Sequence, residues 1–146
     1  MEGDPMASAN VIEPGDYIGI SNLIARYAYC ADYNDPEGFA ELFTDSAKWE
    51  RITEGKESEA VTFFGKRELA GIIIRIAPKK VRHHIMDILI ESSGPDTARA
   101  KFRALITDWR EETPVIARSV TYWTDLLRTS DGWKFSGLRA EATHDT

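Results

Sequence analysis

Apolar residues repeat at two different intervals along the chain, and the change between them separates a helical first half from a strand-rich second half. From Asp16 onward they follow one helical stripe, with spacings of three and four, through Ile20, Leu23, Ile24, Tyr27, Ala28 and Ala31. This pattern predicts an amphipathic helix with Asp16 as its N-cap, ending near Tyr33. Asp35 followed by Pro36 is typical of a helix start and predicts a second, shorter helix through Phe43.

The remaining segments predict one more helix and several strands. A strand is expected over 47–52 and a polar connection over 55–59, before a third helix over 66–77 that Pro78 closes. Beyond Pro78 the period becomes two, which predicts four strands over 81–91, 98–110, 115–128 and 133–143. Asp131-Gly132 is a good hairpin signal before the last of them. Helices followed by consecutive strands predict an α+β domain, with the helices on one face of a curved, mainly antiparallel sheet.

The first fifteen residues are rich in Gly, Pro, Asp, Ser and Asn and have no periodicity, so we expect them to be disordered. The rest of the chain, 16–146, then forms a single domain, because 146 residues with 42% hydrophobic content suit one core.

Charge and composition exclude several classes of protein. A net charge of −6 without a basic block argues against a nucleic-acid partner. The apolar runs are far shorter than the roughly 20 residues needed to cross a bilayer, and no leader-like segment opens the chain, so we expect a cytoplasmic protein that does not bind membranes. The single cysteine, Cys30, excludes an intrachain disulfide and argues against a thiolate metal cluster.

The strand expected over 98–110 gives the clearest assignment of faces. Its basic residues alternate with an apolar row, Ala98, Ala100, Phe102, Ala104 and Ile106, which we expect to face the core. Asp108 continues this inward row, where a carboxylate is either a structural acceptor or part of a site. The alternation weakens at this end, and a bulge would turn Trp109 inward instead.

Two of the three histidines, His83 and His84, are neighbours in the strand expected over 81–91. Histidine is the side chain that exchanges protons near neutral pH. Uniform alternation puts His83 on one face with Val81, Ile85, Asp87 and Leu89, and His84 on the other with Met86, Ile88 and Ile90. Adjacent strand residues point opposite ways, so the pair does not predict a metal site. The pattern alone leaves open which histidine faces the interior and whether either is more than structural.

Asp32 supplies a possible partner for a histidine. It lies one turn beyond Ala28 on the apolar stripe, at the C-terminus of the first helix, where the helix dipole disfavours a negative charge. It is either a local turn residue or an acid that holds an imidazole in the interior. Tyr27, on the same stripe, could present its phenol to the same space or simply pack in the core.

Taken together, several short segments resemble the SnoaL-like branch of the nuclear-transport-factor-like superfamily. They are Ile24-Ala25-Arg26-Tyr27, Asp32, Leu42-Phe43-Thr44-Asp45 with Trp49, Phe64-Gly65, Arg82-His83 with Asp87, and Asp131-Gly132-Trp133-Lys134-Phe135. Their order and spacing, over about residues 16 to 142, make the resemblance specific. It implies a cone-shaped half-barrel in which three helices and a strongly bent sheet enclose an apolar pocket.

The resemblance also implies functional residues. Scytalone dehydratase and its relatives carry an Asp on the first helix and a His on the strand after the third helix, positions that Asp32 and His83 match. Tyr27 matches a polar pocket position of some relatives, and Asp108 falls near a pocket carboxylate of the bile-acid dehydratase. The chain departs from the family at Asp87, where relatives often have Asn. Dimers or trimers are common in the family, so we expect a homodimer or homotrimer.

The expected chemistry is proton transfer without a cofactor or metal. An Asp carboxylate bonded to one imidazole nitrogen leaves the other as a base, which suits a lyase or isomerase of the dehydratase or cyclase type. The substrate would be a hydrophobic polycyclic small molecule such as a polyketide, steroid or terpenoid. Besides Tyr27 and Asp108, its expected contacts are Trp49, Phe64, Met86, Phe102, Trp109, Tyr122 and Trp123.

Two alternatives remain open at this stage. One is a non-catalytic module of the same fold that binds a small ligand or supports a partner subunit. The other is an epoxide hydrolase, a chemistry that uses an Asp-Arg-Asp arrangement; Asp108 and Arg110 rebuild it only in part.

Overall fold

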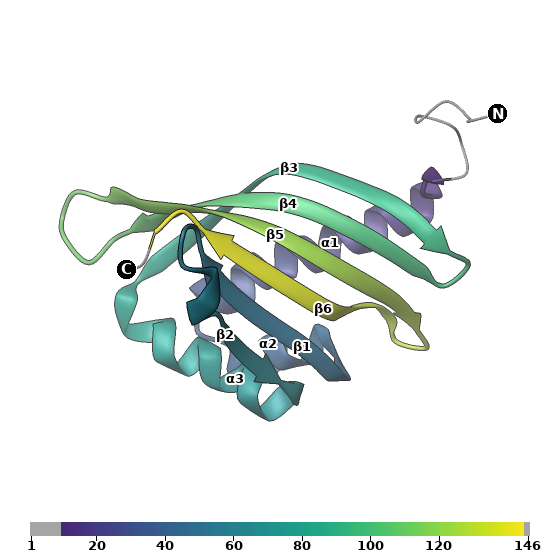
Figure 1. Ribbon diagram of the computed structural model, residues 1–146, viewed down its shortest axis with the longest axis horizontal. Coiled ribbons are helices and arrows are strands. Elements are labelled where there is room, and N and C mark those ends of the chain that lie inside the picture. The colour runs from purple at the N-terminus through teal and green to yellow at the C-terminus, as the bar shows by residue number, and fades with distance from the viewer. Residues whose placement is uncertain (1–9, 145–146) are drawn as a thin grey trace.

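A long helix crosses one face of a bent six-stranded sheet, and two shorter helices cover the sheet's β1–β2 end (Figure 1). The computed structural model describes residues 10–144. The helices are α1 (Pro14–Asp32), α2 (Pro36–Glu41) and α3 (Gly65–Ile76), with 3-10 turns η2 (Glu57–Glu59) and η3 (Ala77–Lys79). The strands are β1 (Phe43–Thr53), β2 (Val61–Phe64), β3 (Val81–Gly94), β4 (Thr97–Asp108), β5 (Val115–Thr129) and β6 (Gly132–Ala142). No helix in this part of the chain is long and apolar enough to cross a membrane.

The sheet is mostly antiparallel and does not close into a barrel. Its strand order is β2-β1-β6-β5-β4-β3, and only β1 and β6 run parallel. The α+β class and the cone-shaped half-barrel expected from the sequence are confirmed. The core lies between the helices and the inner face of the sheet, where Phe39, Phe43, Phe102 and Phe135 are almost fully buried.

The two clearest sequence patterns are confirmed. All six apolar positions of the α1 stripe, from Ile20 to Ala31, are buried against the sheet. In β4 the row from Ala98 to Ile106 is buried, while Arg99 and Arg103 lie on the outer face. Burial of about 25 cal/mol per Å² of apolar surface makes such stripes the main force that holds a helix to a sheet.

Element boundaries differ from the predictions where tertiary contacts decide them. The first helix begins at Pro14, and Asp16 is no N-cap: it accepts hydrogen bonds from Arg128 at 2.7 Å and from Trp133 Nε1 at 3.2 Å. The second helix ends at Glu41, because Phe43 already pairs with Phe135 of β6. Strand β2, which the sequence pattern missed, pairs with β1. Of the segment predicted to be disordered, residues 1–9 lie outside the described residues and 14–15 belong to α1.

Strand β3 changes face at Asp87. Its pairing with β4 shifts between Met86 and Leu89, and Asp87 has a φ of 55°, in the left-handed region that Asn and Asp tolerate better than most residues. The prediction that Leu89 shares a face with His83 is therefore wrong: Leu89 lies outward and is 70% exposed, while Ile90 packs against the core. Asp, like Asn, fits this backbone conformation, so the departure from the resemblance at this position causes no strain.

Candidate active site

Asp32 and His83 meet where α1 ends and β3 begins. The carboxylate lies 2.7 Å from Nδ1 of the imidazole and also accepts the His83 backbone N–H, at 3.1 Å and 3.0 Å to its two oxygens. Both side chains are nearly buried, with exposed fractions of 8% for Asp32 and 10% for His83. One carboxylate thus holds both the backbone and the ring of the histidine in place.

This contact determines which nitrogen of His83 can do chemistry. A carboxylate can only accept, so Nδ1 carries the proton of the bond and the lone pair of a neutral ring lies on Nε2. His83 lines a small cavity on the inner face of the sheet. The neighbouring His84 faces outward, where its Nε2 lies 2.9 Å from Thr107 Oγ1.

Aromatic side chains form the buried wall of this cavity. Tyr27, Trp49 and Tyr122 all line it and are all buried, and the indole N–H of Trp49 donates to the Tyr27 hydroxyl at 3.1 Å. Burial raises the pKa of Tyr27 to about 12 and that of Tyr122 well above its usual value. Both phenols therefore keep their protons at neutral pH and remain hydrogen-bond donors.

Three cationic residues line the less buried part of the same cavity. They are Arg51 of β1, Lys79 of η3 and Arg118 of β5, and each is only partly buried. Nη2 of Arg51 and Nη1 of Arg118 are buried without a hydrogen-bond partner among the described residues. Burial, together with the charges of Arg118, Arg51 and Arg110, lowers the pKa of Lys79.

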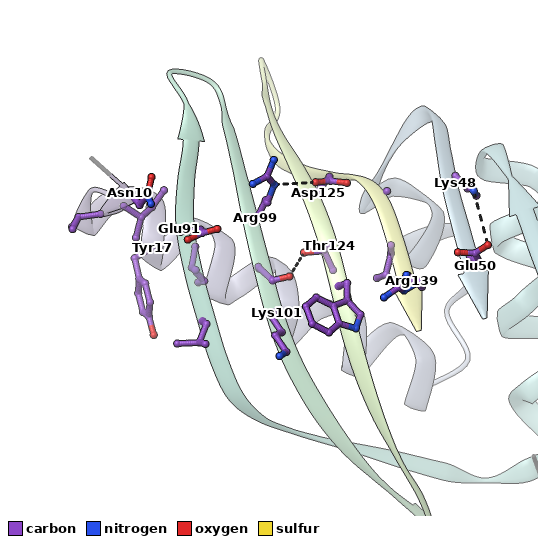
Figure 2. Close-up of a pocket in the computed structure, with 18 residues that line it drawn as sticks. Asn10, Tyr17, Lys48, Glu50, Glu91, Arg99, Lys101, Thr124, Asp125 and Arg139 are labelled. Atoms are coloured by element: carbon purple, nitrogen blue, oxygen red, sulfur yellow. Dashed lines mark hydrogen bonds and ion pairs between the residues drawn. The ribbon is translucent and has the colours of Figure 1, made fainter. Parts of the chain in front are cut away.

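The cavity is small, with a volume of about 80 Å³. A larger groove of about 940 Å³ lies on the outer face of the sheet and includes Arg99, Lys101 and Trp123 (Figure 2). It does not contain Asp32 or His83, and its cationic groups already have partners. Arg99 lies 3.8 Å from Asp125, and the Lys101 ammonium lies 4.2 Å from the centre of the Trp123 ring. We place the candidate site in the smaller cavity, because it holds the oriented imidazole of His83 and two arginine nitrogens without a hydrogen bond to any described residue.

Of the residues expected to contact substrate, the structure brings three to the cavity, namely Tyr27, Trp49 and Tyr122. The others lie elsewhere. Phe102 is fully buried in the core, and Phe64, at 57% exposed, ends the edge strand β2. Met86 and Trp123 lie on the outer face, because alternation turns them away from Ile85 and Tyr122.

Asp108 and Trp109, at the end of β4, also lie outside the lining. Asp108 does end the inward row, but it accepts the Arg110 backbone N–H at 2.9 Å and pairs with the Arg110 guanidinium. These bonds hold the pKa of the Asp108 carboxyl below its usual value. The expected inward turn of Trp109 is wrong: the register shift falls on the β5 side, and Trp109 is 47% exposed.

The cationic residues of the cavity were missed from the sequence, although two of them carried a signal. Arg118 has the same strand phase as the buried Val120 and Tyr122, and Arg51 has the same phase as Ala47 and Trp49. Extending the alternation would have placed both arginines on the inner face. Among residues 10–144, no three His, Cys, Asp or Glu side chains converge on a site that could hold a metal ion.

A known family of domains matches most of this chain. The SnoaL-like domain matches residues 15–139, which is most of the chain. The chain belongs to the SnoaL-like family. No curated protein matches it.

Solved structures similar to this SnoaL-like chain share its fold. An NTF2-like protein with a cystatin-like fold from Novosphingobium aromaticivorans is 22% identical, with a TM-score of 0.75 over 90% of this chain and 84% of that one. A candidate dehydratase of the NTF2-like family from Streptomyces avermitilis is 18% identical, with a TM-score of 0.69 over 87% and 95%. The β subunit of a candidate aromatic-ring-hydroxylating dioxygenase from Novosphingobium aromaticivorans is 17% identical, with a TM-score of 0.74 over 88% and 90%.

Proposed function

We propose that this SnoaL-like protein is a cofactor-independent lyase or isomerase in which Asp32 and His83 move a proton on a hydrophobic small molecule. The observation that supports the proposal most directly is the 2.7 Å contact between the Asp32 carboxylate and Nδ1 of His83 at the cavity. The same carboxylate also accepts the His83 backbone N–H, so it fixes the strand and the ring together. The additional bond to the ring orients an imidazole toward a ligand.

The chemical steps follow from this geometry. Nε2 of His83 removes a proton from a carbon next to a carbonyl group, and the electron pair of the broken C–H bond becomes an enolate. In a lyase that pair forms a C=C bond while a β-hydroxyl leaves, and the imidazolium returns its proton so that water departs. In an isomerase the imidazolium returns the proton to another carbon. Asp32 stabilises the imidazolium in both cases, and the phenol of Tyr27 could donate a hydrogen bond to the developing oxyanion.

The size of the cavity restricts how a substrate binds. Sites that enclose drug-sized ligands typically have volumes of about 300–1,000 Å³, well above the roughly 80 Å³ found beside His83. We therefore propose that only the reacting end of a polycyclic substrate enters the aromatic part of the cavity, while the rest extends past the partly exposed residues at its edge.

The test uses the two adjacent histidines as a matched pair. Hydrophobic β-hydroxy ketones and β,γ-unsaturated ketones are incubated with the protein in D₂O, and NMR follows water loss and deuterium incorporation at carbon. His83→Ala should lower the rate about 10²- to 10⁴-fold. His84→Ala, which removes an outward-facing imidazole from the same strand, should leave it unchanged. Equal rates for the wild type and a folded His83→Ala variant would refute the proposal.

A second candidate function is a non-catalytic module that supports a partner subunit, favoured by the similarity to a dioxygenase β subunit. It would predict no turnover of any compound and equal ligand binding by the wild type and His83→Ala. The epoxide-hydrolase alternative has less support, because Asp108 pairs with Arg110 and neither residue lines the cavity.

A further inference from the structure

Two arginines at the cavity each have a buried guanidinium nitrogen without a hydrogen-bond partner among the residues that the structure describes. Nη2 of Arg51 and Nη1 of Arg118 are buried without a hydrogen bond within the described part of the chain. An unpaired buried cation is costly, because it loses hydration without gaining a counter-charge. Stability does not explain this pair, whereas a bound anion would.

Cross-strand register places Arg118 close to the proposed base. His83 of β3 pairs with Ile106 of β4, and Ile106 pairs with Arg118 of β5, so the three residues form one row on the inner face. Neighbouring strands are about 4.8 Å apart, which puts the backbones of His83 and Arg118 about 10 Å apart across the cavity. Arg51 lies in a second row with Ala140 and Tyr122.

A third cation strengthens the positive charge at this point. Lys79, from the turn before β3, lines the same cavity, and its ammonium is near enough to Arg51 and Arg118 to be repelled by both. The nearest carboxylate that acts on Arg118 is Asp108, which is already bonded to Arg110. No carboxylate within the described residues is thus bonded to either arginine. The cavity keeps this local positive charge although the protein as a whole has a net charge of −6.

We propose that Arg51 and Arg118, assisted by Lys79, bind an anionic group of the ligand, a carboxylate or a phosphate, at the edge of the cavity. Guanidinium groups donate in a planar fork that matches either oxyanion. The ligand class is then an amphiphilic acid, with an apolar body against Trp49 and Tyr122 and its anion at the arginines. The statement that this ligand is the substrate rests on the proposed function; anion binding itself does not.

The test compares three single-ring probes, chosen because the cavity is small. Benzoate, phenyl phosphate and the neutral benzyl alcohol are titrated into the ¹⁵N-labelled full chain at one pH and ionic strength. The indole N–H signal of Trp49 reports the cavity, and that of Trp123 reports the outer face. At least one anion should shift the Trp49 signal with an affinity at least tenfold higher than that of benzyl alcohol, and whether this is benzoate or phenyl phosphate identifies the group. Equal affinities of all three probes would overturn the proposal.

Matched variants assign the effect to the arginines. Arg118→Gln and Arg51→Gln should each weaken anion binding about ten- to a hundredfold, the value of one charge-assisted hydrogen bond, without changing benzyl alcohol binding. Arg99→Gln removes the same charge from the outer face and should have no effect. If Arg99→Gln weakened anion binding as much as Arg118→Gln, the effect would come from net charge alone, and the proposed site would be contradicted.

Thermal unfolding separates a binding role from a structural one. Arg118→Met removes a repelled, unpaired cation, so without ligand this variant should unfold at the same temperature as the wild type or higher, while anions no longer stabilise it. A clearly lower unfolding temperature would show that Arg118 is structural and contradict the proposal. Failure of the two proposals is also distinguishable: an anion site without catalysis gives binding that is independent of His83, whereas catalysis without an anion site leaves the arginine variants fully active.

Discussion

The outer groove and the inner cavity lie on opposite faces of one sheet, and they differ in volume and in how their charged groups are paired. The outer groove is roughly tenfold larger, at about 940 Å³ against about 80 Å³, but its cations are paired with Asp125 and Glu50 or lie against Trp123 (Figure 2). The inner cavity is small and holds an oriented imidazole, two protonated phenols and two arginines with unbonded nitrogens. The difference teaches that volume and unsatisfied polar groups point to different faces of this sheet, and we base the proposed site on the polar groups.

The largest effect is expected from a substitution that removes the carboxylate of Asp32, which orients His83 in the inner cavity. Asp32→Asn keeps the shape but presents an amide, which no longer enforces the proton on Nδ1 or stabilises the imidazolium. Turnover in the deuterium assay should fall about a hundredfold or more. Asp125→Asn, in the outer groove, should leave it unchanged. Equal losses of turnover in both variants would contradict the assignment of the reaction to the inner cavity.

The next largest effect is expected at Asp87, the residue at which the inward-facing positions of β3 change phase. Asp87→Val puts a β-branched residue at a φ of 55° and loses the bond from Arg103, 3.1 Å long. Urea unfolding should show a loss of about 1–2 kcal/mol, whereas Asp87→Asn should be nearly neutral. A tolerated valine would mean that the bulge is not set by this residue.

A smaller effect is a dependence of stability on alkaline pH that only the inner face should show. The pKa of Tyr27 is raised to about 12, so above pH 10 the unfolded state loses its phenolic proton first and stability falls as pH rises. By pH 11 Tyr27 should account for a loss of about 1 kcal/mol. Urea unfolding between pH 9 and 11 should show a shallower slope for Tyr27→Phe. Tyr29→Phe, at a position 61% exposed, should keep the wild-type slope, and a shallower slope there would contradict the assignment.

The smallest effect is expected on the outer face. Lys101→Gln removes a cation that lies over Trp123, and its free energy of unfolding should stay within about 0.5 kcal/mol of the wild type. Activity and benzoate binding should also be unchanged. A loss of activity in this variant would give the large groove a role in the reaction that its paired charges do not suggest.

Sequence periodicity predicted the parts of this molecule that amphipathic patterns control. The α1 stripe and the β4 alternation were confirmed because burial of their apolar faces determines those elements. The same reasoning placed Asp32 on the inward stripe, and the family resemblance selected His83. Their 2.7 Å contact could not be predicted from spacing, because it depends on how α1 packs against β3.

Local irregularities account for most of what the sequence did not reveal. One residue with a positive φ, Asp87, reversed the faces of the second half of β3, and the resulting phase error carried through to Leu89 and Ile90. Met86 and Trp123 failed as substrate contacts for a different reason: aromatic and sulfur-containing side chains suggested a pocket, but strand phase turned them outward. Arg51 and Arg118 were not predicted as cavity residues, because a charged side chain usually lies in solvent. Their strand phase, however, is that of the inward-facing residues.

Strand β3 pairs with β4 on both sides of the bulge at Asp87, but the positions that face the core are odd-numbered before the bulge and even-numbered after it. Deleting one residue between His84 and Asp87 would remove the extra residue of the bulge, so that regular alternation would keep both His83 and Ile90 on the inner face. Homologous sequences can therefore lack one residue in this interval, whereas a one-residue deletion elsewhere in β3 would turn part of the strand to the other face. An alignment that slides a gap through β3 would assign the wrong histidine to the cavity, even where every other element is correctly matched.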